Sequence, residues 1–192
     1  FEIIRYLMLT GDFQMSRNRL EELLRNEEQG SDSYKMGFYY SFLLAMMQSD
    51  PVADSLLGEV LINLPENEKA NDALNLFIVS SLLSSSEKEQ FFHAYRRMQL
   101  FRQEEAVDTL MALYEATKNE EMLILAGEWA QMGNMISTAE SIFSREFENS
   151  ILQDYALLKQ AELEGNKNTA RIFLQENPQS VFSPAFRRLL GN

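Results

Sequence analysis

Apolar residues recur along this sequence at helical intervals, most clearly over segments 103–118 and 120–132. Residues three and four positions apart share one face of an α-helix, so both segments predict amphipathic helices. No segment is apolar on all its faces, so we expect every helix to cover its neighbours and none to be the buried centre of a bundle. The two stripes are Ala106, Val107, Leu110, Leu113, Tyr114 and Thr117, followed by Met122, Leu125, Ala126 and Trp129.

Turn and capping residues divide the chain into about twelve predicted helices. The loops between them span about two to six residues, and such short loops place each helix antiparallel beside the one before it. The predicted segments are about 1–10, 13–28, 33–48, 51–63, 67–84, 87–101, 103–118, 120–132, 135–148, 151–164 and 166–176, with a short last helix from 183. Their start signals include Asp50-Pro51, the capping boxes Ser86/Glu89 and Ser150/Gln153, and Ser183-Pro184.

Composition agrees with an all-α fold. Leu occurs 27 times against 9 Ile and 5 Val, and helices favour Leu whereas sheets favour branched side chains. Only 8 Gly and 4 Pro interrupt the 192 residues, too few for the turns of an all-β domain. No apolar run approaches the roughly 20 residues that a membrane-spanning helix needs. We therefore expect one all-α domain over residues 1–192 and no membrane insertion.

Three predicted turns share one pattern, in which Gly is followed by Asp or Asn and then, five or six places after the Gly, by a small residue. This pattern predicts a tight turn between antiparallel helices: a left-handed Gly ends one helix, Asp or Asn caps the next, and the small residue allows close packing. The three segments are "TGDFQMS" at 10–16, "MGNMISTA" at 132–139 and "EGNKNTA" at 164–170.

With these turns, the chain resembles the tetratricopeptide-repeat proteins, whose unit is a helix–turn–helix of about 34 residues. The best match is "MLILAGEWAQMGNMISTAESIF" at 122–143, whereas residues 33–100 match poorly. The resemblance implies antiparallel hairpins stacked in a right-handed superhelix. The tail "FLQENPQSVFSPAFRRLL" is similar to the closing segment of repeat proteins from bacterial envelopes, which implies a capping segment at 178–192 and a periplasmic or envelope location, with the cytoplasm as the alternative.

Charge and residue counts exclude several classes of function. A formal charge of -12 argues against binding to nucleic-acid phosphates and against adhesion to anionic membranes. Zero Cys and the single His93 leave no ligands for a thiolate or multi-histidine metal site. The acidic pairs Glu104-Glu105 and Glu120-Glu121 stand at predicted helix starts, where they offset the helix dipole. We therefore expect no enzyme, no cofactor and no metal.

A small cationic island is the first candidate contact site. His93, Arg96 and Arg97 are spaced by three and four residues, so they share one face of the predicted helix 87–101. Arg binds carboxylates with two parallel hydrogen bonds, which suits an acidic partner. The alternative is pairing of these cations with acidic groups of neighbouring helices.

Aromatic side chains form the second candidate. Tyr39, Tyr40 and Phe42, with Phe38, surround more of their helix than a single stripe can bury. They would anchor a partner in a groove or against a second chain, or else pack between both flanking helices.

The sequence thus predicts a non-enzymatic scaffold that binds a partner protein or peptide in the groove of a helical-repeat superhelix. The alternative is a regulatory or structural packing domain attached to a region outside this sequence. Because the sequence begins with Phe1 rather than Met, we expect a piece of a longer chain. Homo-oligomerisation is left open.

Overall fold

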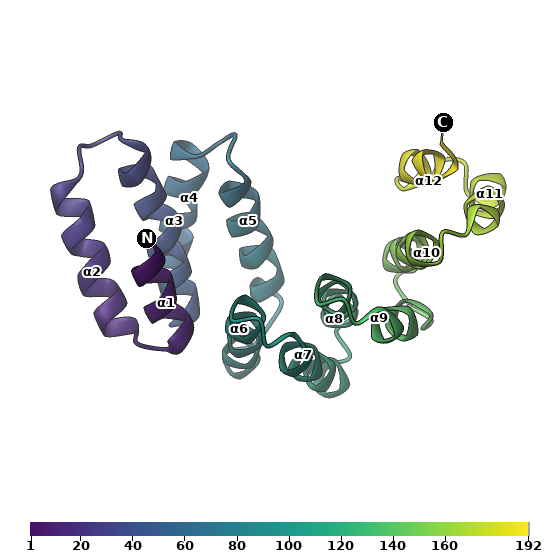
Figure 1. The fold of residues 1–192 in the computed structure, drawn as a ribbon, viewed down its shortest axis with the longest axis horizontal. Helices are drawn as coiled ribbons and strands as arrows, with labels where there is room; N and C mark the ends of the chain where they lie inside the picture. Colours follow the sequence, from purple (N-terminus) through teal and green to yellow (C-terminus); the bar gives the residue numbers. More distant parts are fainter. Residues whose placement is uncertain (192) are drawn as a thin grey trace. The chain divides into compact units, whose positions relative to one another are not determined.

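The computed structural model describes residues 1–191, which form two compact units: an N-terminal unit over residues 1–100 and a C-terminal unit from residue 101 onward (Figure 1). All regular secondary structure within residues 1–191 is α-helical, which confirms the all-α part of the predicted fold class, whereas the stacking into a superhelix stays a prediction. The expectation of a single domain over 1–192 stays a prediction. No helix within the described range is long and apolar enough to cross a membrane.

The N-terminal unit contains six helices. Consecutive helices from α1 to α5 pack against one another, and α6 returns to pack against α1. The helices are α1 (Glu2–Thr10), α2 (Phe13–Asn26), α3 (Asp32–Met47), α4 (Ala53–Asn63), α5 (Glu68–Ser81) and α6 (Ser85–Gln99).

The central helix of this unit is α3, which contacts α1, α2, α4 and α5 (Figure 1). The expectation that no helix lies at a buried centre is therefore wrong for α3. Its segment Leu43–Met46 is buried on every face because neighbours surround it. A helix covered on several sides has no single apolar stripe, which explains why its aromatic cluster wraps around the helix.

As far as residue 191, the C-terminal unit also contains six helices, and helices adjacent in sequence pack against one another. Further contacts skip one helix, from α8 to α10 and from α10 to α12. The helices are α7 (Gln103–Thr117), α8 (Glu120–Met132), α9 (Ile136–Phe143), α10 (Ser150–Glu164), α11 (Lys167–Glu176) and α12 (Ser183–Leu190).

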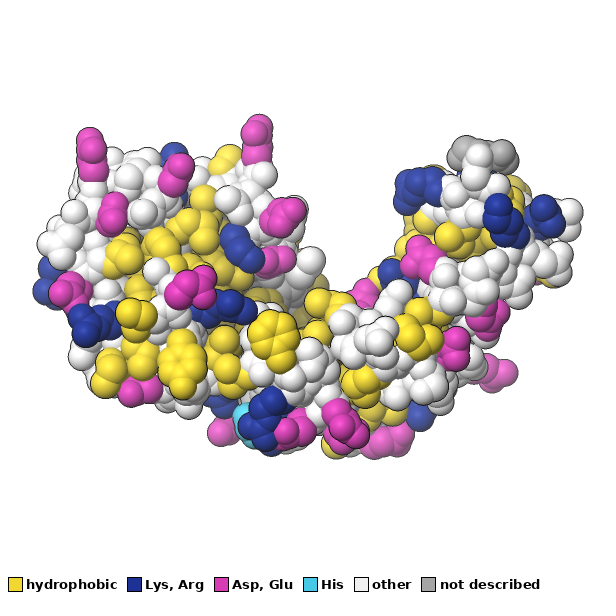
Figure 2. Space-filling model, viewed as in Figure 1, with side chains coloured by type: hydrophobic (Ala, Val, Ile, Leu, Met, Phe, Trp, Pro, Cys, Tyr) yellow, Lys and Arg dark blue, Asp and Glu magenta, His cyan; other side chains and the backbone are white. Residues whose placement is uncertain are grey.

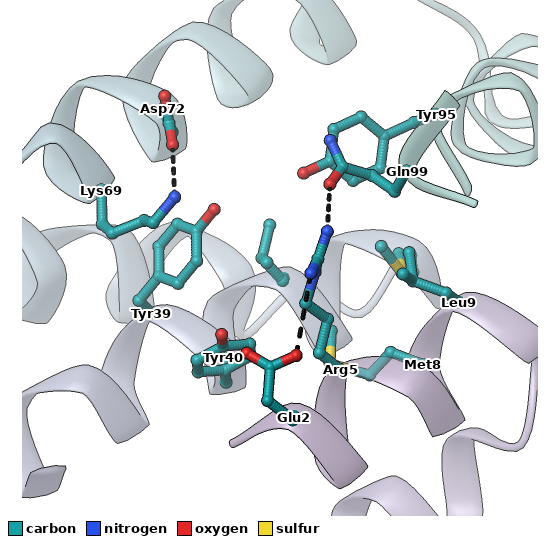
Figure 3. A pocket seen from close by; sticks show the side chains of 12 residues that line it. Glu2, Arg5, Met8, Leu9, Tyr39, Tyr40, Lys69, Asp72, Tyr95 and Gln99 are labelled. Atoms are coloured by element: carbon teal, nitrogen blue, oxygen red, sulfur yellow. Dashed lines mark hydrogen bonds and ion pairs between the residues drawn. The ribbon is translucent and has the colours of Figure 1, made fainter. Parts of the chain in front are cut away.

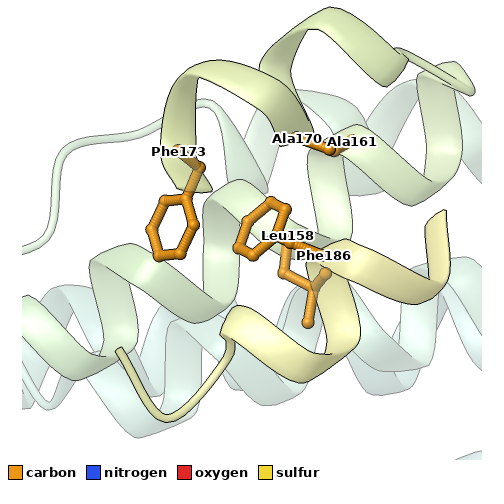
Figure 4. Close-up of a cluster of buried hydrophobic side chains, with 5 residues drawn as sticks. All are labelled: Leu158, Ala161, Ala170, Phe173 and Phe186. Carbon is orange, nitrogen blue, oxygen red and sulfur yellow. The ribbon is translucent and has the colours of Figure 1, made fainter. Parts of the chain in front are cut away.

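An aromatic cluster closes the end of this unit, where the sequence predicted a capping segment. Phe173 of α11 and Phe186 of α12 are buried against each other, and Leu158 of α10 lies beside them (Figure 4). Ala161 and Ala170 bring α10 and α11 close together because neither has a side chain beyond Cβ. Three helices thus share one small core.

Two of the three predicted turns have the expected geometry. Gly11 and Gly165 adopt left-handed conformations with φ of 89° and 62°, and the side chains of Asp12 and Asn166 cap the helices that follow. The turn at Gly133 differs, because Gly133 has φ -79° and the left-handed residue is the next one, at φ 58°. The predicted small residues Ser16, Ala139 and Ala170 are fully buried, which confirms their packing role.

Several predicted helix ends are wrong by a few residues. The helix α4 begins at Ala53 rather than at Pro51, since the Asp50 carboxylate accepts a hydrogen bond from the backbone N–H of Val52 and forms a turn first. The helix α9 ends at Phe143 instead of continuing to about 148.

The capping boxes also lie elsewhere than predicted. The box of α6 is formed by Ser84 and Glu87, whose carboxylate accepts from the Ser84 backbone N–H at 2.7 Å. The N-cap of α10 is Asn149. Gln153 instead accepts a hydrogen bond from the backbone N–H of Phe147.

Candidate functional site

A pocket of about 330 Å³ opens between α1, α3, α5 and α6 of the N-terminal unit (Figure 3). This volume is near the lower limit for small-ligand sites, roughly 300–1,000 Å³, so it suits one or two side chains. Four helices contribute to it: Glu2, Arg5, Met8 and Leu9 come from α1, Tyr39, Tyr40, Leu43 and Met47 from α3, Lys69 and Asp72 from α5, and Tyr95 and Gln99 from α6.

The apolar part of the pocket comes from α1 and α3. Met8, Leu9 and Leu43 are buried, and Met47 is half-buried. The burial of Met8, Leu9 and Leu43 places this part of the pocket next to the core of the N-terminal unit. The thioethers of Met8 and Met47 are flexible and polarisable, so this surface can adapt to apolar groups of different shape.

Three tyrosines surround the pocket, and their phenols stay neutral at physiological pH. Burial is the main cause of the raised pKa of Tyr39, and the nearby Tyr95 and Asp72 raise it further. Burial likewise raises the pKa of Tyr95 to about 12. The pKa of Tyr40 is raised by burial and by Glu2, against the opposing effect of Arg5 and Lys69. Neutral phenols can both donate and accept hydrogen bonds.

Arg5 extends from α1 toward α6 across the pocket (Figure 3). Its Nη2 donates to Gln99 Oε1 at 2.9 Å, which joins residues 94 positions apart. Its Nη1 lies 3.9 Å from the carboxylate of Glu2, whose side chain is 89% exposed. The ring of Tyr40, which also lines the pocket, stacks on the ring of Phe1 with centroids 4.9 Å apart.

Lys69 and Asp72 line the opposite side of the pocket, beside Tyr39 (Figure 3). They are three residues apart on α5, so their side chains meet, with Lys69 Nζ 3.0 Å from Asp72 Oδ2. The same ammonium lies 5.4 Å from the centroid of the Tyr39 ring. The ion pair leaves this side of the pocket with no net charge.

The polar groups of the pocket are charged and hydrogen-bonding side chains. The twelve lining residues include no Ser, Cys or His. Among residues 1–191 no three His, Asp or Glu side chains are grouped so as to hold a metal ion. What the pocket offers is an apolar floor beneath a guanidinium, an ammonium and three phenols.

The structure separates the aromatic residues selected from the sequence. Tyr39 and Tyr40 line the pocket. Phe42 is fully buried, at 0% exposure, because it points into the contacts of α3 with its neighbours. Phe42 therefore follows the packing alternative and has no surface left for a partner.

The cationic residues selected from the sequence lie on α6 but do not line the pocket, to which α6 contributes Tyr95 and Gln99. His93 is exposed, and Arg96 and Arg97 are half-buried. The Arg96 guanidinium lies 5.4 Å from the centroid of the Phe13 ring, and burial lowers its pKa while Glu89 raises it. Arg96 thus already contacts a neighbouring helix of its own chain.

Sequence reasoning missed Arg5, Lys69 and Gln99. Local patterns do place Arg5 on the helix 1–10, between the apolar residues Ile4 and Met8, at the edge of a buried stripe. Nothing local connects it with Gln99, because that pairing depends on the packing of α6 against α1.

Comparison of the chain with protein-family models, with curated proteins and with solved structures finds no match of any of the three kinds. The site must therefore be interpreted from its own geometry and chemistry.

Proposed function

We propose that this protein is a non-enzymatic interaction scaffold of tetratricopeptide type, which binds a partner protein or peptide through its helical hairpins. The pocket of the N-terminal unit carries the proposal, because it combines an apolar floor with hydrogen-bonding and charged groups. Such a mixture is typical of sites that anchor side chains of a partner. The packing of consecutive helices and the Gly turns support the repeat architecture and its proposed right-handed superhelix.

The proposal can be tested by photo-crosslinking from the rim of the pocket. We would replace Glu2 by benzoylphenylalanine, since this side chain is 89% exposed and its replacement leaves the core intact. The matched control carries the same group in place of Ile151, which is 59% exposed in the C-terminal unit. We expect one protein to be crosslinked in source cells from position 2 and not from position 151.

Two further measurements decide whether the crosslink reports a partner. The crosslinked protein, once purified, should bind this chain saturably and at a fixed stoichiometry. A peptide copied from its crosslinked segment should compete for that binding. The scaffold proposal is contradicted if both positions give the same crosslinks or if the purified protein does not bind.

His93, Arg96 and Arg97 remain our proposal for a second, charged contact with the partner. Because Arg96 lies over Phe13, substitution of Arg96 would also disturb packing. His93→Glu is the cleaner test, since His93 is exposed. Weaker binding of the purified partner to this variant, with an unchanged helical spectrum, would support the contact, and unchanged binding would contradict it.

The alternative function, a packing domain for a further region of the chain, is favoured by an exposed apolar stripe along α5. Leu74, Ile78 and the C-cap residue Leu82 recur every four residues, with Leu82 56% exposed. Contiguous exposed apolar surface often marks a contact site. If this alternative is correct, crosslinks from position 2 or from Ile78 will join segments of the same polypeptide.

A further inference from the structure

The rim of the pocket contains one cation that its neighbours satisfy only in part. From this feature we infer that the pocket binds a carboxylate attached to an apolar group, such as a Glu or Asp side chain next to an apolar residue of a partner peptide, and that Arg5 holds the carboxylate. This inference rests on the proposed scaffold function and specifies what its pocket recognises.

Arg5 is the group that selects the ligand. A guanidinium has five N–H donors in a planar fork that fits the two oxygens of a carboxylate. Within residues 1–191, the hydrogen bond that Arg5 makes goes to the neutral amide of Gln99, and its carboxylate contact is Glu2 at 3.9 Å. The guanidinium therefore has N–H donors left for an incoming carboxylate. While these donors bind the carboxylate, the hydrogen bond to Gln99 keeps the guanidinium in place across the pocket.

The acidic side chains near Arg5 neither neutralise its charge as a bound carboxylate would nor strongly repel an anion. Glu2 is so exposed that water screens most of its attraction to Arg5, and its side chain can turn away at little cost. On the opposite side, Asp72 is paired with Lys69 at 3.0 Å, so its repulsion of an anion is largely offset. The Arg5 side chain itself is 40% exposed, which leaves it accessible and only partly hydrated.

The floor of the pocket determines what the carboxylate must be attached to. Below the charged rim lie Met8, Leu9, Leu43 and Met47, so an apolar group that enters the pocket is removed from water. A free inorganic anion would leave this surface uncovered, and a purely apolar group would bury Arg5 without a partner. A ligand with both parts satisfies the rim and the floor together.

We would test this inference with two probes that differ in a single functional group, 4-phenylbutyrate and the neutral 4-phenylbutyramide. Binding can be followed by NMR on protein labelled with ¹³C in its methionine methyl groups, because Met8 and Met47 line the pocket. We expect the acid to shift both signals with a Kd of about 1 mM. The amide should bind roughly 10- to 100-fold more weakly, since it lacks the charge-assisted hydrogen bonds.

Three variants separate the role of Arg5 from general effects. Arg5→Gln should remove the preference for the acid over the amide. Arg17→Gln is the matched control, because Arg17 likewise donates to a glutamine, Gln48, but lies outside the pocket, and it should leave the preference unchanged. Glu2→Gln should tighten binding of the acid about two- to fivefold, since it removes a weak competitor for Arg5 without touching the core.

Equal binding of the acid and the amide would overturn the inference, as would the absence of any shift of Met8 and Met47 at about 10 mM acid. Weaker binding of the acid to Glu2→Gln would overturn it as well, even if Arg5→Gln failed to fold. The proposed function is tested separately by the crosslinking experiment. If a partner is crosslinked from position 2 but the pocket shows no preference for the acid over the amide, the carboxylate inference is refuted and the proposed function is not.

Discussion

The rings of Phe173 and Phe186 stack with their centroids 4.0 Å apart and an interplanar angle of 21°. This contact joins α11 to α12, and Phe186 is completely buried. We predict that Phe186→Ala lowers the free energy of unfolding of the C-terminal unit by about 3–5 kcal/mol, because it removes a buried ring and leaves a cavity. Chemical denaturation measures the change. In Val181→Ala, at a residue that is 76% exposed, stability should change little.

We predict that replacement by Ala changes stability in opposite directions at Gly127 and at Gly58. A Cβ on Gly127 would lie 2.7 Å from the ring of Phe143 and 3.1 Å from Ile142 Cγ2, whereas nothing lies within 4 Å of a Cβ on Gly58. Both residues are helical, so Ala gains up to about 1 kcal/mol from helix propensity. At Gly127 we expect overpacking of about 1–3 kcal/mol to outweigh that gain.

Thermal unfolding of the two variants measures this difference. The midpoint should fall for Gly127→Ala and rise for Gly58→Ala. Higher stability of Gly127→Ala than of the unsubstituted protein would show that α8 and α9 pack less closely than described here.

Because tyrosines 39 and 95 are buried, we predict that the free energy of unfolding falls at alkaline pH. Burial raises the pKa of Tyr95 from 10.0 to about 12 and raises the pKa of Tyr39 in the same direction. Between pH 10 and pH 12 the folded state therefore binds more protons than the unfolded state. The stabilisation is fully present below pH 10 and is lost as the pH rises toward 12.

Denaturation curves recorded from neutral pH to pH 12 measure this loss of unfolding free energy. Tyr95→Phe should make the loss of unfolding free energy with pH less steep, because a phenylalanine has no phenol to ionise. The matched control is Tyr6→Phe, at a tyrosine that is 61% exposed, and it should leave the pH dependence unchanged. An equal effect of the two substitutions would contradict the role of Tyr95.

Glu120 joins the start of α8 to the loop before α10. Its two carboxylate oxygens accept hydrogen bonds from the backbone N–H groups of Glu148 and Asn149, at 2.6 and 3.0 Å. We predict that Glu120→Ala lowers the stability of the C-terminal unit by about 1–2 kcal/mol and speeds amide hydrogen exchange at positions 148 and 149. Glu121→Ala is the control, because it removes the same charge from the same helix turn. If both substitutions had equal effects, Glu120 would stabilise the protein only through its charge near the helix dipole and not through these hydrogen bonds.

The sequence predicts the helices well because the signals for them are local. Gly11 and Gly165 end their helices as expected, since left-handed backbone is inexpensive only for Gly. The end of α9 was missed because apolar residues continue past it: Phe147 is buried, yet it lies in the loop after the helix. A buried residue is thus not always a helical one.

The pocket could be predicted only in part. Tyr39 and Tyr40 stand out because their aromatic cluster exceeds one helix stripe, and both do line the pocket. Arg5 and Lys69 have no such signal, because their roles depend on the positions of α1 and α5 around α3. Phe42 belongs to the same aromatic cluster in the sequence, but helical rotation turns it into the core.

The hydrogen bond from Arg5 to Gln99 has a consequence for biosynthesis. In the C-terminal unit the main contacts of each helix are with helices one or two elements away, so these helices can dock soon after they leave the ribosome. In the N-terminal unit α1 packs against α2, but it also contacts α6, where Gln99 lies 94 residues after Arg5. The contact of α1 with α6 can therefore form only after α6 has been made, and until then the pocket lacks the side that Tyr95 and Gln99 supply, which leaves it open to chaperones.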